Sequence, residues 1–186
     1  IVLNNFTVFS TNDVKKINHC YNKAEFIISG SKNITEYLKF TFPKIKKIHQ
    51  TIISIDKKIF SSNISKKKII TYMPRKLKKE SSLLFLYLKK HMPKDWKIVA
   101  LDNMTEKQVS LNLNKSKIFL SFSELEGLGR PPLEAAIAGN KVIGYHGQGG
   151  KEYMKEPIFT IIERRNILKF AKTIIQNIDK DINKKV

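Results

Sequence analysis

Glu126-Gly127-Leu128-Gly129-Arg130-Pro131-Pro132-Leu133-Glu134 is the stretch of the chain that decides its fold. The apolar run at 117–122 ahead of it predicts a buried strand. Pro131 suits the first turn of a helix, where its missing N–H costs no hydrogen bond. That helix is expected to stop at Gly139-Asn140, and residues 142–145 predict the next strand. We therefore expect an α/β protein with a Rossmann-like parallel sheet and flanking helices, in which this loop lies at the carboxyl ends of the strands, where ligands bind.

Residues 123–143 resemble the Glu-x7-Glu segment of retaining glycosyltransferases of the two-Rossmann-domain (GT-B) type, family four. The likeness combines two glutamates eight positions apart, glycines after the first, a proline at the helix start and a glycine-ended turn into a strand. The resemblance implies a site for a nucleoside-diphosphate sugar, with Glu134 on the ribose hydroxyls and Glu126 beside the donor sugar. It also implies that the sugar or the diphosphate contacts the amides of Gly127, Leu128 and Gly129.

Each of these residues also fits a plainer role. In the first turn of a helix, Glu134 would gain about 0.3–1 kcal/mol from the helix dipole as a capping residue. Gly127 and Gly129 could simply permit a positive φ in a turn. The combination favours the donor site, because a capping role requires neither the second glutamate nor the loop.

Arg75 is the next candidate, since it follows the strand predicted at 69–73. At the carboxyl edge of a sheet a planar guanidinium can clamp a diphosphate through two hydrogen bonds. The resemblance implies a lysine a few residues later, and Lys76, Lys78 and Lys79 are all available. We assign Lys79, so the expected catalytic set is Glu126, Arg75 and Lys79.

Two more loops are expected at the same edge of the sheet. Asp102 and Asn103 follow the strand predicted at 96–101, where the family holds the nucleotide base; a turn with a helix cap is the alternative. Residues 147–150 form a glycine-rich turn after the strand predicted at 142–145. Glycines let the backbone approach a ligand closely, so this turn is a candidate lining of the site.

Strands and helices alternate along the chain, which is typical of a parallel α/β sheet. We expect strands at 1–9, 24–29 and 45–49, a helix capped by residues 10–13, and a second helix capped by Ser31. The resemblance implies that 1–60 is the end of an acceptor-side domain with the interdomain crossover. It implies that 61–186 is the C-terminal nucleotide-sugar-binding domain of a GT-B fold, closed by an amphipathic helix.

The chain has 35 lysines and arginines against 16 acidic residues, a net charge of +19. A basic face is typical of nucleic-acid binders, but only four of these residues are arginines and no basic motif interleaved with aromatic residues is present. We therefore expect no nucleic-acid partner. The densest lysine cluster, residues 44–79, is either solvated surface or a site of attraction to anionic lipid headgroups near a membrane-bound acceptor.

Cys20 is the single cysteine, so the chain holds no internal disulfide and no multi-cysteine metal site. The histidines lie far apart in the sequence, and we expect no bound metal and no cofactor besides the donor substrate. No apolar run approaches the ~20 residues of a membrane span, and no signal-peptide pattern is present. We expect a cytoplasmic protein, with the inner face of the membrane as the alternative location.

The resemblance implies a hexosyltransferase of polysaccharide biosynthesis. It would move a sugar from a nucleoside-diphosphate sugar to a glycan or lipid-linked acceptor with retention. A two-domain enzyme of this kind is longer than 186 residues and this chain begins with Ile1, so we expect the piece to lack most of the N-terminal half and to be inactive alone. Two alternatives stay open: a binding-only nucleotide-sugar module and a basic nucleic-acid-binding protein.

Overall fold

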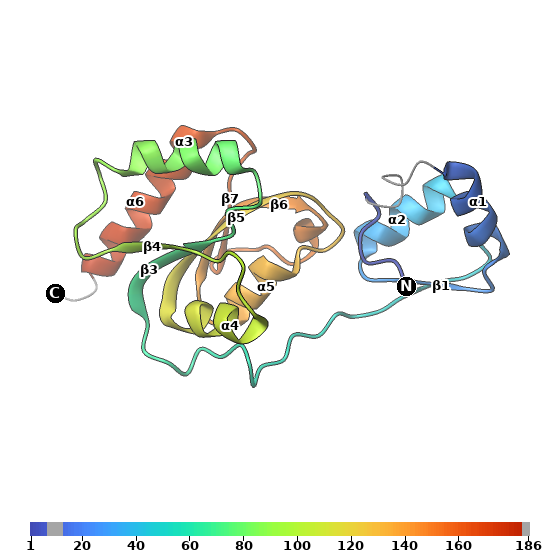
Figure 1. Ribbon diagram of the computed structural model, residues 1–186, viewed down its shortest axis with the longest axis horizontal. Helices are drawn as coiled ribbons and strands as arrows, with labels where there is room; N and C mark the ends of the chain where they lie inside the picture. Colours follow the sequence, from blue (N-terminus) through green and yellow to red (C-terminus); the bar gives the residue numbers. More distant parts are fainter. Residues whose placement is uncertain (7–12, 184–186) are drawn as a thin grey trace. The chain divides into compact units, whose positions relative to one another are not determined.

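The computed structural model describes residues 1–6 and 13–183, the side chains of 181–183 excepted (Figure 1). The chain divides into two compact units. The first unit contains Ile1–Ser54 together with Glu124–Arg130 and His146–Tyr153. The second unit contains Ile55–Ser123, Pro131–Tyr145 and the chain from Met154 onward. The predicted assignment of 1–60 and 61–186 to an acceptor-side and a donor-side domain stays a prediction.

Two helices and a pair of short parallel strands make up most of the first unit: α1 (Val14–Lys23), β1 (Ile27–Ser29), α2 (Lys32–Thr41) and β2 (Ile48–Gln50). The predicted caps are confirmed, because Asp13 accepts from the Lys16 amide and Ser31 accepts from the Ile34 amide. The small core consists of Val2, Ile27, Ile34, Leu38 and Phe42. The strand predicted at 1–9 is not formed in its described part, residues 1–6, where only Val2 pairs, as a single bridge to Ser29; residues 7–9 lie outside the described residues.

The second unit is built on a five-stranded sheet in the order β4-β3-β5-β6-β7, with parallel pairing. The Rossmann-like α/β class predicted from the sequence is confirmed. The strands are β3 (Lys67–Tyr72), β4 (Lys97–Ala100), β5 (Ser116–Glu126), β6 (Lys141–Gln148) and β7 (Phe159–Ile161). The helices are α3 (Lys78–Leu88), α4 (Glu106–Lys115), α5 (Arg130–Ile137) and α6 (Ile167–Asn183), and the 3-10 turn η1 spans Gly149–Glu152.

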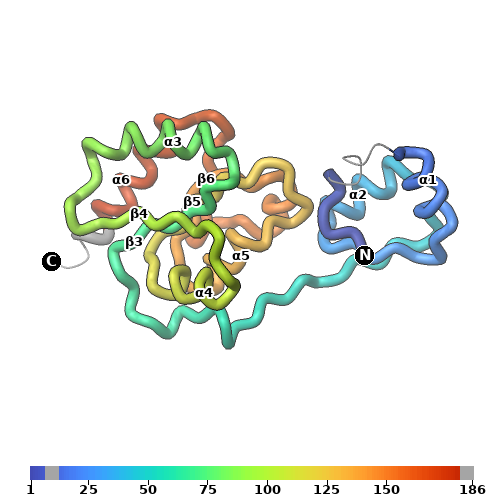
Figure 2. The backbone as a smooth tube through the Cα atoms, in the orientation of Figure 1, coloured from blue at the N-terminus to red at the C-terminus, as the bar shows by residue number. Residues whose placement is uncertain are grey.

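Alternate residues of β5 direct Ile118, Leu120 and Phe122 into one buried core with α3 and α6. Helices α3 and α6 pack against each other on this side of the sheet, as the tube in Figure 2 shows. Helices α4 and α5 cover the opposite side (Figure 1), with α4 in contact with β3. Each helix thereby buries one apolar stripe against a sheet whose two faces are both covered.

Some elements differ from their predicted bounds. Strand β5 was predicted to end at residue 122 but runs to Glu126, because backbone pairing continues beyond the apolar residues that mark the core. Strand β7 was not predicted from the sequence. None of the helices in the described part of the chain is long and apolar enough to cross a membrane.

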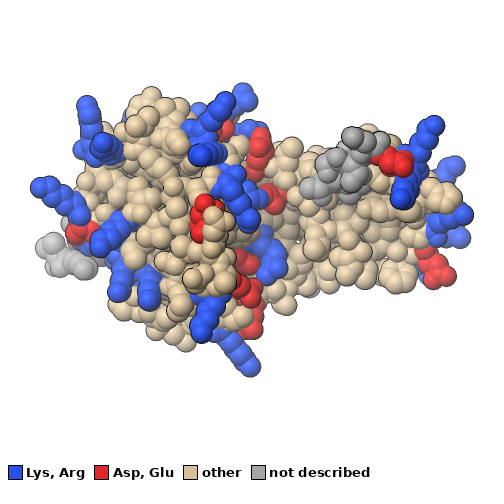
Figure 3. All heavy atoms as spheres, viewed as in Figure 1, with Lys and Arg blue, Asp and Glu red and all other residues tan. Residues whose placement is uncertain are grey.

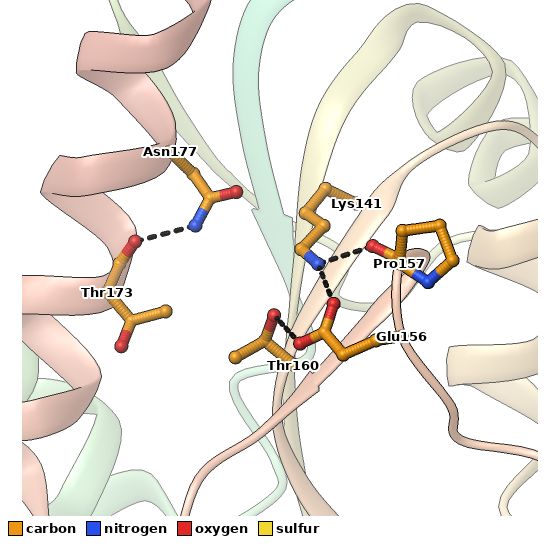
Figure 4. A network of polar contacts seen from close by, with 6 residues as sticks. All are labelled: Lys141, Glu156, Pro157, Thr160, Thr173 and Asn177. Carbon is orange, nitrogen blue, oxygen red and sulfur yellow. Dashed lines mark hydrogen bonds and ion pairs between the residues drawn. The ribbon is translucent and has the colours of Figure 1, made fainter.

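A polar network fastens the segment between β6 and β7 (Figure 4). Lys141 donates to a carboxylate oxygen of Glu156 at 2.9 Å, and the Thr160 hydroxyl donates to the other oxygen at 2.7 Å. These two donors hold the pKa of Glu156 below its ordinary value, the Thr160 hydrogen bond being the larger cause. The network secures the short edge strand that the hydrophobic pattern alone does not define.

Candidate functional site

The strand order of the second unit defines where a ligand is expected to bind. From β3 the chain crosses to β4 on one side and then returns to β5 on the other, so the order reverses between β3 and β5. In open α/β sheets, ligands bind beyond the carboxyl ends of the strands at such a reversal. A ligand is therefore expected to contact the residues that follow β3 and those at the carboxyl half of β5.

A tight turn follows β3 and presents two cations. The Lys76 amide bonds to the Met73 carbonyl at 3.2 Å, which closes a four-residue turn with Pro74 at its second position, as proline's fixed φ favours. Arg75 is exposed at the third position. Leu77 then adopts φ 46°, a left-handed conformation that leucine rarely takes, while its side chain packs against the core. Backbone strain of this kind is concentrated at functional sites.

Lys76 is the lysine that faces the reversal point. With Met73 it lines a small cavity whose other walls are Phe119, Leu120, Ser121, Phe122, Ser123, Pro131 and Pro132. Burial, and then the neighbouring Arg75 guanidinium, lower the pKa of Lys76. Both effects disfavour the ammonium form of Lys76. An anion bound between Lys76 and Arg75 would offset the repulsion between these two cations. Lys79, assigned from the sequence, is an exposed residue in the first turn of α3.

Helix α5 begins one residue earlier than the proline suggests, at Arg130, so Pro131 lies in its first turn as predicted. Glu134 is consequently the fifth residue of the helix, and no acidic residue occupies the first turn. The expectation that Glu134 lies in the first turn was therefore wrong. Glu134 is also 9% exposed, which sets it apart from a surface capping residue, because burying a carboxylate is costly unless it is partnered.

The loop after β4 carries Asp102 and Asn103, both exposed. Asn103 has φ 50°, which asparagine tolerates better than most residues. Thr105 then caps α4 in a reciprocal capping box with Gln108, so the turn-and-cap alternative is correct for this part of the loop. A role in holding a nucleotide base stays a prediction for Asp102 and Asn103.

Glu126 and the glycine loop belong to the first unit. Gly127 is buried, and a Cβ at this position would lie 2.7 Å from the Ile34 side chain and 2.8 Å from the Leu3 carbonyl oxygen. Its φ is not in the left-handed region, whereas Gly129 has φ 80°. The turn explanation therefore holds for Gly129, while Gly127 is required by close packing against α2 and the N-terminal segment.

The glycine-rich turn at 147–150 packs on that same loop. A Cβ on Gly149 would lie 2.0 Å from the Gly127 carbonyl oxygen, so two backbone segments meet here without side chains between them. His146 accepts from the Gln148 amide through Nδ1 at 2.9 Å. Burial, and then the Lys151 ammonium, lower the pKa of His146. The close approach that these glycines were predicted to allow is therefore made to protein backbone.

Three side chains of the first unit hold these loops and were not identified from the sequence as contributors. Ser31 donates to the Gly127 carbonyl at 2.6 Å, and the Tyr153 hydroxyl donates to the Gly129 carbonyl at 2.5 Å. Glu152 accepts from the Asn33 amide at 2.9 Å, at the amino end of α2. Only the capping role of Ser31 could be inferred from local sequence, since the other contacts join residues more than twenty positions apart.

The second unit is thus a Rossmann-like α/β domain with two adjacent cations and a buried helix glutamate in the segments that adjoin its strand-order reversal. No protein-family model matches the chain. The chain is 31% identical over 106 residues to an alpha-1,6-glucosyltransferase of Actinobacillus pleuropneumoniae serotype 7 (strain AP76). The matched region covers 55% of this chain and 31% of that protein, so the chain spans about a third of its relative's length. This similarity supports a glycosyltransferase function.

Proposed function

We propose that this chain carries the nucleotide-sugar-binding part of a retaining GT-B glycosyltransferase of family four. The observation that carries the proposal is that the Glu-x7-Glu segment leads from the end of β5 into α5, whose Glu134 is buried in the second unit. The glucosyltransferase relative supports the same class. The substrate would be a nucleoside-diphosphate hexose, and the acceptor a glycan or a lipid-linked glycan.

Within the second unit the residues divide by chemistry. Glu134, a buried carboxylate, would accept hydrogen bonds from the ribose hydroxyls, which is the role the family resemblance implies. Arg75 would clamp the diphosphate through its planar guanidinium, and Lys76 would add a second positive charge. Asp102 and Asn103 would contact the base. Lys76 replaces Lys79 in this proposal because Lys76 lines the cavity at the reversal.

The chemical contribution of the two cations would be electrostatic. When the bond from the anomeric carbon to the diphosphate breaks, negative charge accumulates on the leaving diphosphate. Cations already held in place stabilise that charge without reorganising at the moment of reaction. Glu126 and the amides of Gly127, Leu128 and Gly129 would position the donor sugar, as the resemblance implies.

A ligand screen tests the proposal directly. The chain is mixed with ADP, GDP, UDP or CDP, with the matching monophosphates, and with pyrophosphate, and its unfolding temperature is measured. A ligand at a hundred times its Kd adds about 2.7 kcal/mol to the free energy of unfolding. We expect one diphosphate to stabilise the chain more than its monophosphate and more than pyrophosphate. Stabilisation by none of the diphosphates would refute the donor-site assignment.

Salt dependence separates this function from nucleic-acid binding. Binding that neutralises many phosphates weakens steeply with salt, because each contact releases counterions. A nucleoside diphosphate offers only two phosphates, so its affinity should fall much less between low and high salt. Tight binding of an oligonucleotide with a steep salt dependence, and no response to nucleoside diphosphates, would favour the nucleic-acid alternative.

A further inference from the structure

Helix α3 is apolar on two sides, although only one side faces the core. Its residues 83–88 are Leu-Leu-Phe-Leu-Tyr-Leu, and Leu84 and Leu88 are fully buried in the second unit. Leu83, Leu86 and Tyr87 are 43%, 69% and 52% exposed. Positions three and four apart share a helix face, so these three side chains form a continuous outward strip. We refer to Leu83, Leu86 and Tyr87 as the α3 strip.

Shallow apolar grooves continue this surface on both sides of the helix. A groove of about 310 Å³ lies between α3 and α6, lined by Tyr87, Leu88, His91, Leu168, Ala171, Lys172, Ile175 and Gln176. A second groove of about 530 Å³ is lined by Ser82, Phe85, Leu86, Leu88, Lys89, Met92, Pro93, Lys94, Trp96 and Ile98. Single exposed apolar residues are ordinary, whereas a contiguous apolar surface of this kind marks an interaction site.

The charges around the α3 strip are mostly positive, and the two nearby carboxylates, Glu80 and Asp95, are ion-paired with Arg164 and Lys68. Lys79 lies four positions before Leu83 on the same face of α3, and Lys90 lies in the turn just beyond the end of the helix; both are exposed. In Figure 3 blue side chains project near both ends of α3, with tan atoms between them. Among the described residues that line the two grooves, the charged ones are lysines and none is a carboxylate. The surface therefore suits an anionic partner.

The packing of α3 narrows the kind of partner. Because Leu84 and Leu88 are locked in the core, the helix cannot leave the sheet to be enclosed by a groove on another protein. A second copy of this chain would bring lysines against lysines, which costs binding energy. A broad anionic surface with an apolar interior can bind a helix that stays fixed on its sheet, and it matches both the apolar strip and the surrounding lysines. A bilayer offers this, since tyrosine and leucine enter the headgroup boundary while lysine stems extend to lipid phosphates.

We propose that the α3 strip and its flanking lysines bind the surface of an anionic lipid bilayer. The strip enters the interface between headgroups and acyl chains, and Lys89, Lys90 and Lys94 contact lipid phosphates. Each such lysine strengthens the attraction to a negatively charged membrane surface. This surface shares none of the residues assigned to the donor in the second unit, so the proposal stands or falls independently of the proposed function.

Vesicle sedimentation with the full chain tests this surface. We expect binding to vesicles of phosphatidylcholine mixed with phosphatidylglycerol, little binding to phosphatidylcholine alone, and weakening by salt. Leu86→Asp should lower the partition coefficient roughly tenfold or more, because a charge replaces an apolar side chain in the interface. The matched control is Leu111→Asp, which changes an exposed leucine of α4 and should bind as the wild type does.

Removing two of the lysines provides an independent test of the proposal. The double change Lys90→Gln with Lys94→Gln should lower binding to anionic vesicles roughly tenfold, while Lys107→Gln with Lys115→Gln on α4 should leave it nearly unchanged. If Leu86→Asp lowers the unfolding temperature, Leu86→Ser takes its place. Equal vesicle binding by the α3 variants and their controls would overturn the proposal. Capture of polyglutamate without any vesicle binding would also overturn it, in favour of an acidic protein.

Discussion

The side chain of Ser31 donates a 2.6 Å hydrogen bond to the carbonyl oxygen of Gly127, 96 positions away in the sequence. The same hydroxyl accepts from the Ile34 amide at 3.1 Å, so a single residue caps α2 and holds the glycine loop. Both groups lie in the first unit. The loop that carries the Glu-x7-Glu resemblance is therefore anchored to the first helical segments of the chain.

Replacing Ser31 by alanine should show whether Ser31 holds the glycine loop in addition to capping α2. We expect Ser31→Ala to lower the free energy of unfolding by about 1–2 kcal/mol, as the loss of an N-cap does, and to weaken nucleotide-sugar binding as well. Asp13→Ala is the matched control, because it removes the N-cap hydrogen bond of α1 in the same unit. Denaturant melts and calorimetric titration measure both effects. An equal change of ligand affinity in the two variants would argue against an anchoring role.

Glu134→Gln should weaken binding of the preferred nucleoside diphosphate by about 1–3 kcal/mol, the range for a lost hydrogen bond to a charged group. Calorimetric titration of the folded variant measures this. Glu106→Gln, at the first position of α4, controls for the general effect of removing a helix carboxylate and should bind normally. Unchanged affinity in the Glu134 variant would leave that side chain a structural role only.

The two candidate lysines can be distinguished by one comparison. Lys76→Met should reduce diphosphate affinity while sparing the nucleoside, because Lys76 lines the cavity at the strand-order reversal. Lys79→Met should change neither, since that side chain is an exposed residue of α3. Titration of each variant with the diphosphate and with the nucleoside decides between them. The reverse outcome would restore the assignment made from the sequence.

Arg75→Lys should lose most of the diphosphate affinity and little of the nucleoside affinity. Lysine keeps the charge but cannot supply two parallel N–H donors in one plane. Arg164→Lys, an exposed arginine in the turn before α6, is the control for a change of cation type. Equal losses for the diphosphate and the nucleoside would show that Arg75 acts on the fold of the turn and not on phosphate.

Lys66 should make stability depend on pH at the alkaline end. Its ammonium donates to carbonyl oxygens at the ends of α4 and α5, Leu113 and Ala138, and burial lowers its pKa to about 8 from 10.5. Between these values the unfolded chain binds more protons than the folded chain, so this group makes the free energy of unfolding rise with pH. Denaturant melts at pH values across this window measure the slope.

Lys67, the next residue, provides the control for the dependence of the free energy of unfolding on pH. Lys66→Met should flatten the rise in stability above pH 8, although it lowers stability overall by removing two hydrogen bonds, whereas the exposed Lys67→Met should keep the slope. A slope that persists in Lys66→Met would assign the effect to other groups.

Local signals predicted much of the β5–α5–β6 segment. An apolar run, a proline in the first turn and Gly139 with φ 82° each act within a few residues, so sequence alone is sufficient for them. The end of β5 was predicted four residues too early. Residues 124–126 leave the core of the second unit, and their strand pairing has no hydrophobic pattern to mark it.

The sequence by itself determined the α/β class, the caps at Asp13 and Ser31, and the candidate residues of the Glu-x7-Glu segment, because these depend on local periodicity and short-range hydrogen bonds. Tertiary structure alone decided that Lys76 and not Lys79 lines the cavity at the reversal. It also decided that Gly127 is needed for packing and that Ser31 reaches the Gly127 carbonyl. Such choices depend on which distant backbone segments meet, and no short stretch of residues encodes that meeting.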